Sequence, residues 1–60
     1  MQKWAYAGLT LNPAGVVVGG QFAGATFGQA ASNLGNEGWE LVLNFTLPNG
    51  AIEFIFKRPI

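Results

Sequence analysis

The stretch WELVLNFTLPNGAIEFIFKR, residues 39–58, holds the two clearest strand signals of the chain. Polar and apolar side chains alternate in its two halves, 39–46 and 51–58, which are rich in β-branched and aromatic residues. Asn49 and Gly50 lie between the halves, and this dipeptide is a strong short signal for a β-hairpin. The stretch therefore predicts two adjacent antiparallel strands.

The register of this hairpin is predicted from its apolar pattern. A two-residue loop pairs Phe45 with Phe54, and a four-residue loop keeps that pairing. A three-residue loop would set Phe45 opposite Glu53, so we reject it, because a slip of one residue moves every side chain to the other face. We expect a helix to cover the apolar face and leave the mixed face open. The predicted covered face comprises Trp39, Leu41, Leu43, Phe45, Ile52, Phe54 and Phe56, and the other face comprises Val42, Asn44, Thr46, Glu53, Ile55 and Lys57.

The N-terminal part of the chain predicts a second hairpin. Residues 2–11 alternate as a strand, with Trp4 and Tyr6 on one face. Residues 12–15, NPAG, predict a turn, and residues 16–18, VVV, predict a short β-branched strand. We expect Trp4 and Tyr6 to belong to the core, with the lining of a pocket as the alternative.

Between the two hairpins the apolar residues recur at steps of three and four, which predicts an amphipathic helix from Gly20 to Leu34. Gly35 is expected to cap its C-terminus. The sequence thus predicts one small α+β domain over residues 1–60, with the order ββαββ, a mostly antiparallel sheet and one helix packed across one face. The helical stripe comprises Phe22, Ala23, Thr26, Phe27, Ala30, Ala31 and Leu34.

Three glycines of this predicted helix, Gly20, Gly24 and Gly28, are spaced four residues apart. Small residues at this spacing allow helices to approach closely in a membrane, but residues 16–34 are too polar for a span of about 20 apolar residues. A phosphate cradle needs free N–H groups before a helix, which leaves only Gly19 and its neighbours as an anion site. We therefore favour close packing against another subunit.

Length and composition favour a homo-oligomer. A chain of 60 residues buries only about 60% of the surface that its unfolded form exposes, and the usual remedies for so small a core are disulfides, metals or association. The chain has neither Cys nor His, so no disulfide, metal site or cofactor is expected. Only 10% of the residues are charged, well below the usual share of about 25%, so part of the surface is expected to meet other copies.

The charge balance of the chain limits the classes of partner that it is expected to bind. The formal net charge is zero and no polybasic segment is present, so neither a long nucleic acid nor an anionic membrane is an expected partner. The N-terminal residues MQKWAYAG show no apolar signal-peptide core. The cytoplasm is the expected compartment.

The side chains available for catalysis are few. The chain has no His, Cys or Asp, and its three carboxylates are Glu37, Glu40 and Glu53. A general base needs a tuned group with an orienting partner, whereas surface carboxylates are usually solvated or paired. We expect a protein that is not an enzyme.

The motifs EGWELV (37–42), SNLG (32–35), FIFKRP (54–59) and KWAY (3–6) resemble a small domain-of-unknown-function family of bacteria and their phages. This resemblance implies a strand-helix-strand-strand frame and no reaction. The family usually carries polar residues where this chain has Ala5 and Ala7. Small phage proteins of this general build include oligomeric sponges that sequester cyclic nucleotide signals, so the resemblance adds such a ligand as an expectation.

The sequence thus offers candidate residues for ligand binding and for an oligomer interface. It also leaves two classes of protein as alternatives to a sponge. A sponge would stack a nucleotide on an aromatic ring and hold its phosphates with cations. The competing classes are an assembly or adaptor protein that binds only itself or another protein, and a glycine-zipper membrane peptide. The candidate ligand residues are Lys3, Trp4, Tyr6, Gly19, Gly20, Gln21, Lys57 and Arg58, and the candidate oligomer interface is Ala5, Ala7, Gly24, Gly28, Ser32, Val42 and Ile55.

Overall fold

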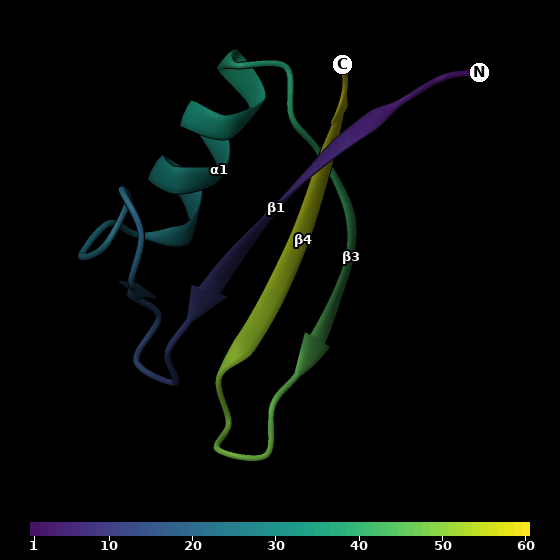
Figure 1. Ribbon diagram of the computed structural model, residues 1–60. Helices are drawn as coiled ribbons and strands as arrows, with labels where there is room; N and C mark the ends of the chain where they lie inside the picture. Colours follow the sequence, from purple (N-terminus) through teal and green to yellow (C-terminus); the bar gives the residue numbers. More distant parts are fainter.

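The computed structural model describes all residues from Met1 to Ile60 and has one four-stranded sheet with one helix (Figure 1). The strand order is β2-β1-β4-β3, and each neighbouring pair is antiparallel. The α+β class and the order ββαββ are therefore confirmed. The elements are β1 (Trp4–Leu11), β2 (Val17–Val18), α1 (Phe27–Asn36), β3 (Glu40–Thr46) and β4 (Ile52–Pro59).

The helix begins later than the apolar period predicted. Thr26 is the N-cap, its hydroxyl accepts from the N–H of Gln29, and the Gln29 side chain accepts from the N–H of Thr26. This capping box starts the helix. Gly20 and Gly24 precede it at φ +72° and +88°, which a right-handed helix does not allow. The predicted ladder of three helical glycines is therefore wrong, since only Gly28 lies in α1.

The helix also ends later than expected. Gly35 lies inside α1, and the left-handed position after the C-cap is taken by Gly38 at φ +88°. The N–H of Gly38 donates to the carbonyl of Gly35, and the N–H of Trp39 donates to that of Leu34. These two bonds form a Schellman motif, which turns the chain from α1 into β3.

The hairpin between β3 and β4 has the register that the sequence analysis rejected. Phe45 lies opposite Glu53, because the loop has three residues. The N–H of Gly50 donates to the carbonyl of Leu47, and the N–H of Leu47 donates to that of Ala51. Pro48 favours a normal turn at this position, whereas a two-residue loop would need Asn49 at positive φ, and no residue other than glycine has one.

This register exchanges the two faces of the C-terminal half of β3. Asn44 pairs with Phe54 on the side of the helix, while Leu43 pairs with Ile55 on the other side, because directly paired residues share a face. A bulge between Leu41 and Leu43 restores the original alternation, so Leu41 still shares the face of the core. The prediction that Leu43 and Phe45 lie beneath the helix is therefore wrong.

The core lies between α1 and the central strands β1 and β4. Its buried side chains include Ala30 and Leu34 of the helix, as the helical stripe predicted. The ring centroids of Phe27 and Phe54 are 4.4 Å apart. With ten residues, the helix α1 is too short to span a membrane. The buried core cluster comprises Leu9, Val17, Ala30, Leu34, Phe54 and Phe56.

Candidate functional site

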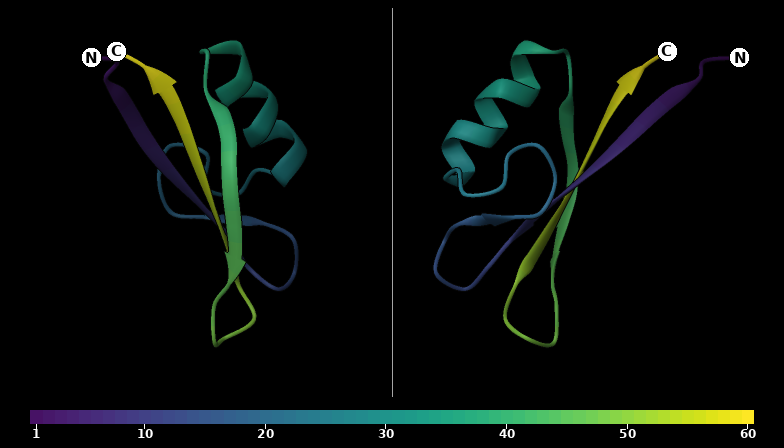
Figure 2. Two further views of the ribbon diagram at one scale, coloured as in Figure 1. Left: turned by 90° about the vertical axis from the view of Figure 1, so that its right-hand side faces the viewer. Right: turned by 60° about the vertical axis from the view of Figure 1, so that its left-hand side comes forward.

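The sheet has one side that α1 does not cover, which we call the open face. Figure 2 shows the helix on one side of the twisted sheet. The open face carries large apolar side chains: Leu43 is 48% exposed, Phe45 is 47% exposed and Tyr6 is 65% exposed. By register the open face comprises Trp4, Tyr6, Gly8 and Thr10 of β1, Glu40, Leu43 and Phe45 of β3, and Glu53, Ile55 and Lys57 of β4.

The Glu53 carboxylate lies over β1 on the open face. The Thr10 hydroxyl donates to Glu53 Oε1 at 2.6 Å. A Cβ atom built on Gly8 would lie 2.8 Å from Glu53 Oε2, which is closer than real Cβ contacts allow. The missing side chain of Gly8 therefore gives the Glu53 carboxylate its place over β1.

One end of the open face gathers three of the predicted ligand residues. Tyr6 is paired with Lys57, and Lys57 Nζ lies 4.1 Å from the centroid of the Trp4 ring, a cation–π distance. Lys57 Nζ is also 3.7 Å from Glu40 Oε1. Trp4 is 37% exposed, so the prediction that Trp4 and Tyr6 belong to the core is wrong, and both are surface aromatics beside a paired cation.

Arg58 lies on the other side of the sheet, because it follows Lys57 on a strand. Its guanidinium carbon is 4.5 Å from the centroid of the Trp39 ring, and its Nη1 donates to the carbonyl of Glu37 at 2.9 Å. This carbonyl is at the C-terminus of α1, where a positive charge is favourable. Arg58 thus binds to the C-terminus of α1. Within one chain, Arg58 and Lys57 lie on opposite sides of the sheet and cannot contact the same ligand. The Lys3 carbonyl accepts from the N–H of Ile60 at the same end of the sheet.

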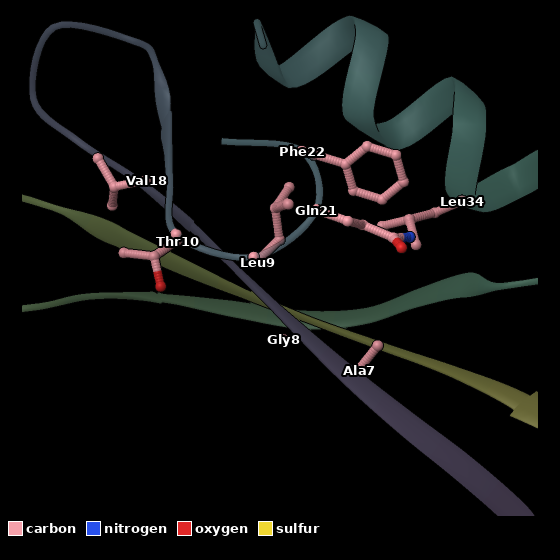
Figure 3. A pocket seen from close by; sticks show the side chains of 10 residues that line it. Ala7, Gly8, Leu9, Thr10, Val18, Gln21, Phe22 and Leu34 are labelled. Atoms are coloured by element: carbon pink, nitrogen blue, oxygen red, sulfur yellow. The ribbon is translucent and has the colours of Figure 1, made fainter. Parts of the chain in front are cut away.

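The remaining predicted ligand residues, Gly19, Gly20 and Gln21, line a cavity of about 360 Å³ beside β1 (Figure 3). Figure 3 shows the side chains of Gln21 and Phe22 extending toward Leu34. The cavity is on the helix side of the sheet edge, separate from the aromatic end of the open face. Its lining residues are Ala7, Gly8, Leu9, Thr10, Val18, Gly19, Gly20, Gln21, Phe22 and Leu34.

The residues predicted for an oligomer interface do not share one surface. Ile55 lies on the open face, Val42 lies at the bulge of β3, and Ala7 lines the cavity. Ala5 lies on the helix side of β1, opposite Arg58. Gly24 lies in the loop before α1, while Gly28 and Ser32 are exposed on α1.

The sequence reasoning missed Leu43 and Phe45 as surface residues. Pro48 was the signal that could have found them, because a proline at this position favours a longer turn than the Asn-Gly dipeptide alone. The apolar cavity residues Leu9, Phe22 and Leu34 were predicted only as strand or core residues, and no local motif marks the cavity.

Comparison of the chain with protein-family models, curated proteins and solved structures finds no match. The open face and the cavity are therefore the two features of the structure that bear on function.

Proposed function

We propose that this chain is a non-catalytic, cytoplasmic subunit of a homo-oligomer, and that two copies associate through their open faces. The observation that carries the proposal is the set of exposed apolar side chains on the open face, chiefly Leu43 and Phe45. Contiguous exposed apolar surface of this kind marks an interaction site. The absence of cysteine from the chain fits the cytoplasm.

The size and charge of the open face suit a weak interface with a second copy. The three long strands β1, β3 and β4 have seven or eight residues each. At about 3.3 Å per residue and about 4.8 Å between strands, the open face covers on the order of 400 Å² in projection, which is in the range of weak interfaces. Lys57 of this face already pairs with Glu40, and Glu53 already accepts from Thr10. The Lys57–Glu40 pair brings no net charge into the interface. Glu53 has a hydroxyl donor but no cation, so its burial between two copies costs free energy that the apolar contacts must exceed.

The edge of the sheet is a less suitable interface than the face. β3 is an edge strand with exposed apolar residues, and edge strands can pair with other chains. The bulge between Leu41 and Leu43 interrupts the β3–β4 ladder, and bulges are a usual device that prevents pairing between edges. We therefore assign the interface to the open face.

The ligand that we propose for the oligomer is a small anion such as a cyclic nucleotide, held between subunits in the manner of a sponge. Tyr6 and Lys57 support this proposal, because a base can stack on an exposed ring beside a cation. Tyr6 pairs with Lys57 close to the contact between Lys3 and Ile60, so both lie near the chain termini at one end of the open face. Figure 2 shows the two termini at the same end of the sheet. A ligand can reach them there while the middle of the face is covered.

The alternative is an assembly or adaptor protein that binds only itself or another protein. It is favoured by the pairing of Lys57 with Glu40, which offsets the charge that a phosphate would need, and by the position of Arg58 on the other side of the sheet. A thermal-shift series with cyclic dinucleotides distinguishes the two, since only the sponge gains stability from the ligand.

The interface is tested with a matched pair of variants on β3. Leu43 and Leu41 are the same residue type, with exposures of 48% and 47%, but they point to opposite sides of the sheet. We expect Leu43→Ser to weaken self-association by about tenfold or more, because apolar area buried between the copies is lost. The measurement is the dissociation constant from sedimentation equilibrium.

Leu41→Ser is the control. Its dissociation constant is expected to stay within about twofold of that of the unmodified chain, because Leu41 makes no contact between the copies and substitutions away from an interface have small effects on it. A loss of association with Leu41→Ser but not with Leu43→Ser would contradict the assignment to the open face. Circular dichroism checks that both variants remain folded.

A further inference from the structure

The cavity beside β1 is formed by one chain and lies away from the open face. Five of its ten lining residues are hydrophobic. Its volume of about 360 Å³ falls in the range of small-molecule sites, which are mostly apolar with a few polar groups that fix the ligand. The polar groups of this cavity lie on β1 and on the loop of residues 19–22.

The edge of β1 offers an unpaired backbone group. The N–H of Asn12 donates to the carbonyl of Val16, so the even-numbered residues of β1 direct their backbone groups toward β2, because this direction alternates along a strand. β2 is short, and its pairing with β1 ends at Thr10. Gly8 is the next even-numbered residue, and its N–H and carbonyl have no strand partner on that side.

The loop that faces this edge offers further donors. The backbone N–H groups of residues 19–22 donate to no atom of the chain. They lie on the segment that closes the cavity opposite β1. The side-chain amide of Gln21 also makes no hydrogen bond within the chain, and Figure 3 shows it between β1 and α1. Residues with free donors on the loop and Gly8 of the strand thus line the same largely apolar cavity.

None of the ten lining residues carries a charge. An anion bound here would be separated from water without a cation to compensate it, which is costly. A neutral ligand carries no such cost. The chemistry of the cavity therefore differs from that of the aromatic end of the open face, where a lysine is present.

We propose that this cavity binds a small uncharged molecule with a flat apolar body and an adjacent acceptor and donor, as in a bicyclic aromatic lactam. The apolar body lies against Leu9, Phe22 and Leu34. The ligand carbonyl accepts from the N–H of Gly8 and from the side-chain amide of Gln21, and its N–H donates to the carbonyl of Gly8. Both backbone groups of an edge-strand residue point the same way, as do the two adjacent groups of a lactam. The site is complete in a single chain, so it does not rest on self-association.

The test is a titration of the ¹⁵N-labelled protein with quinolin-2(1H)-one, followed by amide chemical shifts. We expect saturable shifts at Gly8, Gly19, Gly20 and Gln21, with a dissociation constant of about 1 mM, as suits a ligand of this size. The N-methylated lactam lacks the donor and is expected to bind about tenfold more weakly. Quinoline-2-carboxylate, which is anionic, is expected to produce no saturable shift at these amides.

Ala7→Leu adds a side chain to the cavity and is expected to abolish the shifts, and Ala14→Leu is the matched control, because Ala14 lies in the exposed 12–15 turn outside the cavity. If Ala7→Leu does not fold, Gln21→Ala replaces it, since the Gln21 side chain is exposed, and it is expected to weaken binding severalfold. The proposal is overturned if the lactam gives no saturable shifts at these amides, if the carboxylate binds more tightly than the lactam, or if the shifts fall on the open face instead.

Discussion

Gly8 shows how a single residue shapes the open face. The position lies inside β1, where a side chain would normally improve packing and a glycine weakens the strand. Its place is taken by the Glu53 carboxylate, which accepts from Thr10 over the bare backbone. The carboxylate therefore lies over the backbone of β1, and the apolar side chains of Leu43 and Phe45 on the same face stay exposed.

Gly8→Ala is expected to lower the free energy of unfolding by about 1 kcal/mol, because the new Cβ displaces the Glu53 carboxylate and breaks its bond to Thr10. The measurement is urea denaturation. In a Glu53→Ala background the same substitution is expected to be neutral or stabilising, since alanine restricts the unfolded chain more than glycine does. An equal loss in both backgrounds would show that the carboxylate does not occupy the space over Gly8.

At the scale of elements, the structure departs from the sequence expectations at the boundaries of α1 and in the β3–β4 register. The apolar period runs through residues 20–34, but it could not show that Gly20 and Gly24 have left-handed backbones. The capping residues Thr26 and Gln29 did carry that information. The strands themselves were predictable, because β-branched and aromatic alternation is a strong local signal.

Two glycines at the C-terminus of α1 give a matched test of where the helix ends. Gly38→Ala is expected to lower the free energy of unfolding by about 1 kcal/mol, because Gly38 has φ +88° in the Schellman motif. Gly35→Ala, three residues earlier and inside the helix, is expected to raise it by about 0.5–1 kcal/mol. Thermal unfolding of both variants checks the signs. The opposite pair of signs would place the cap at Gly35, where the sequence alone predicted it.

At the scale of the whole molecule, the core is small because one face of the sheet is left uncovered. Only 7 of 60 residues are buried, because one short helix can cover one side of the sheet and not both. The sequence predicted this shortage from length and charge, and it placed Ile55 on the uncovered side. It could not identify Leu43 and Phe45, because one extra loop residue reverses which side chains the face presents.

The candidate site was predictable only in part, because it depends on long-range strand pairing and on a loop that no sequence pattern encodes. The Tyr6–Lys57 pair follows from the strand order, which needs the long-range pairing of β1 with β4. The separation of Lys57 from Arg58 follows from strand alternation alone. The cavity depends on the 18–22 loop folding back over β1, and no periodic pattern encodes such a loop.

Sedimentation equilibrium of the unmodified chain, from a few micromolar to about 0.5 mM, tests the open-face association most directly. The account predicts a concentration-dependent mass that rises to at least twice that of one chain, because the exposed apolar face is buried between copies. A mass equal to that of one folded chain over the whole range would contradict it.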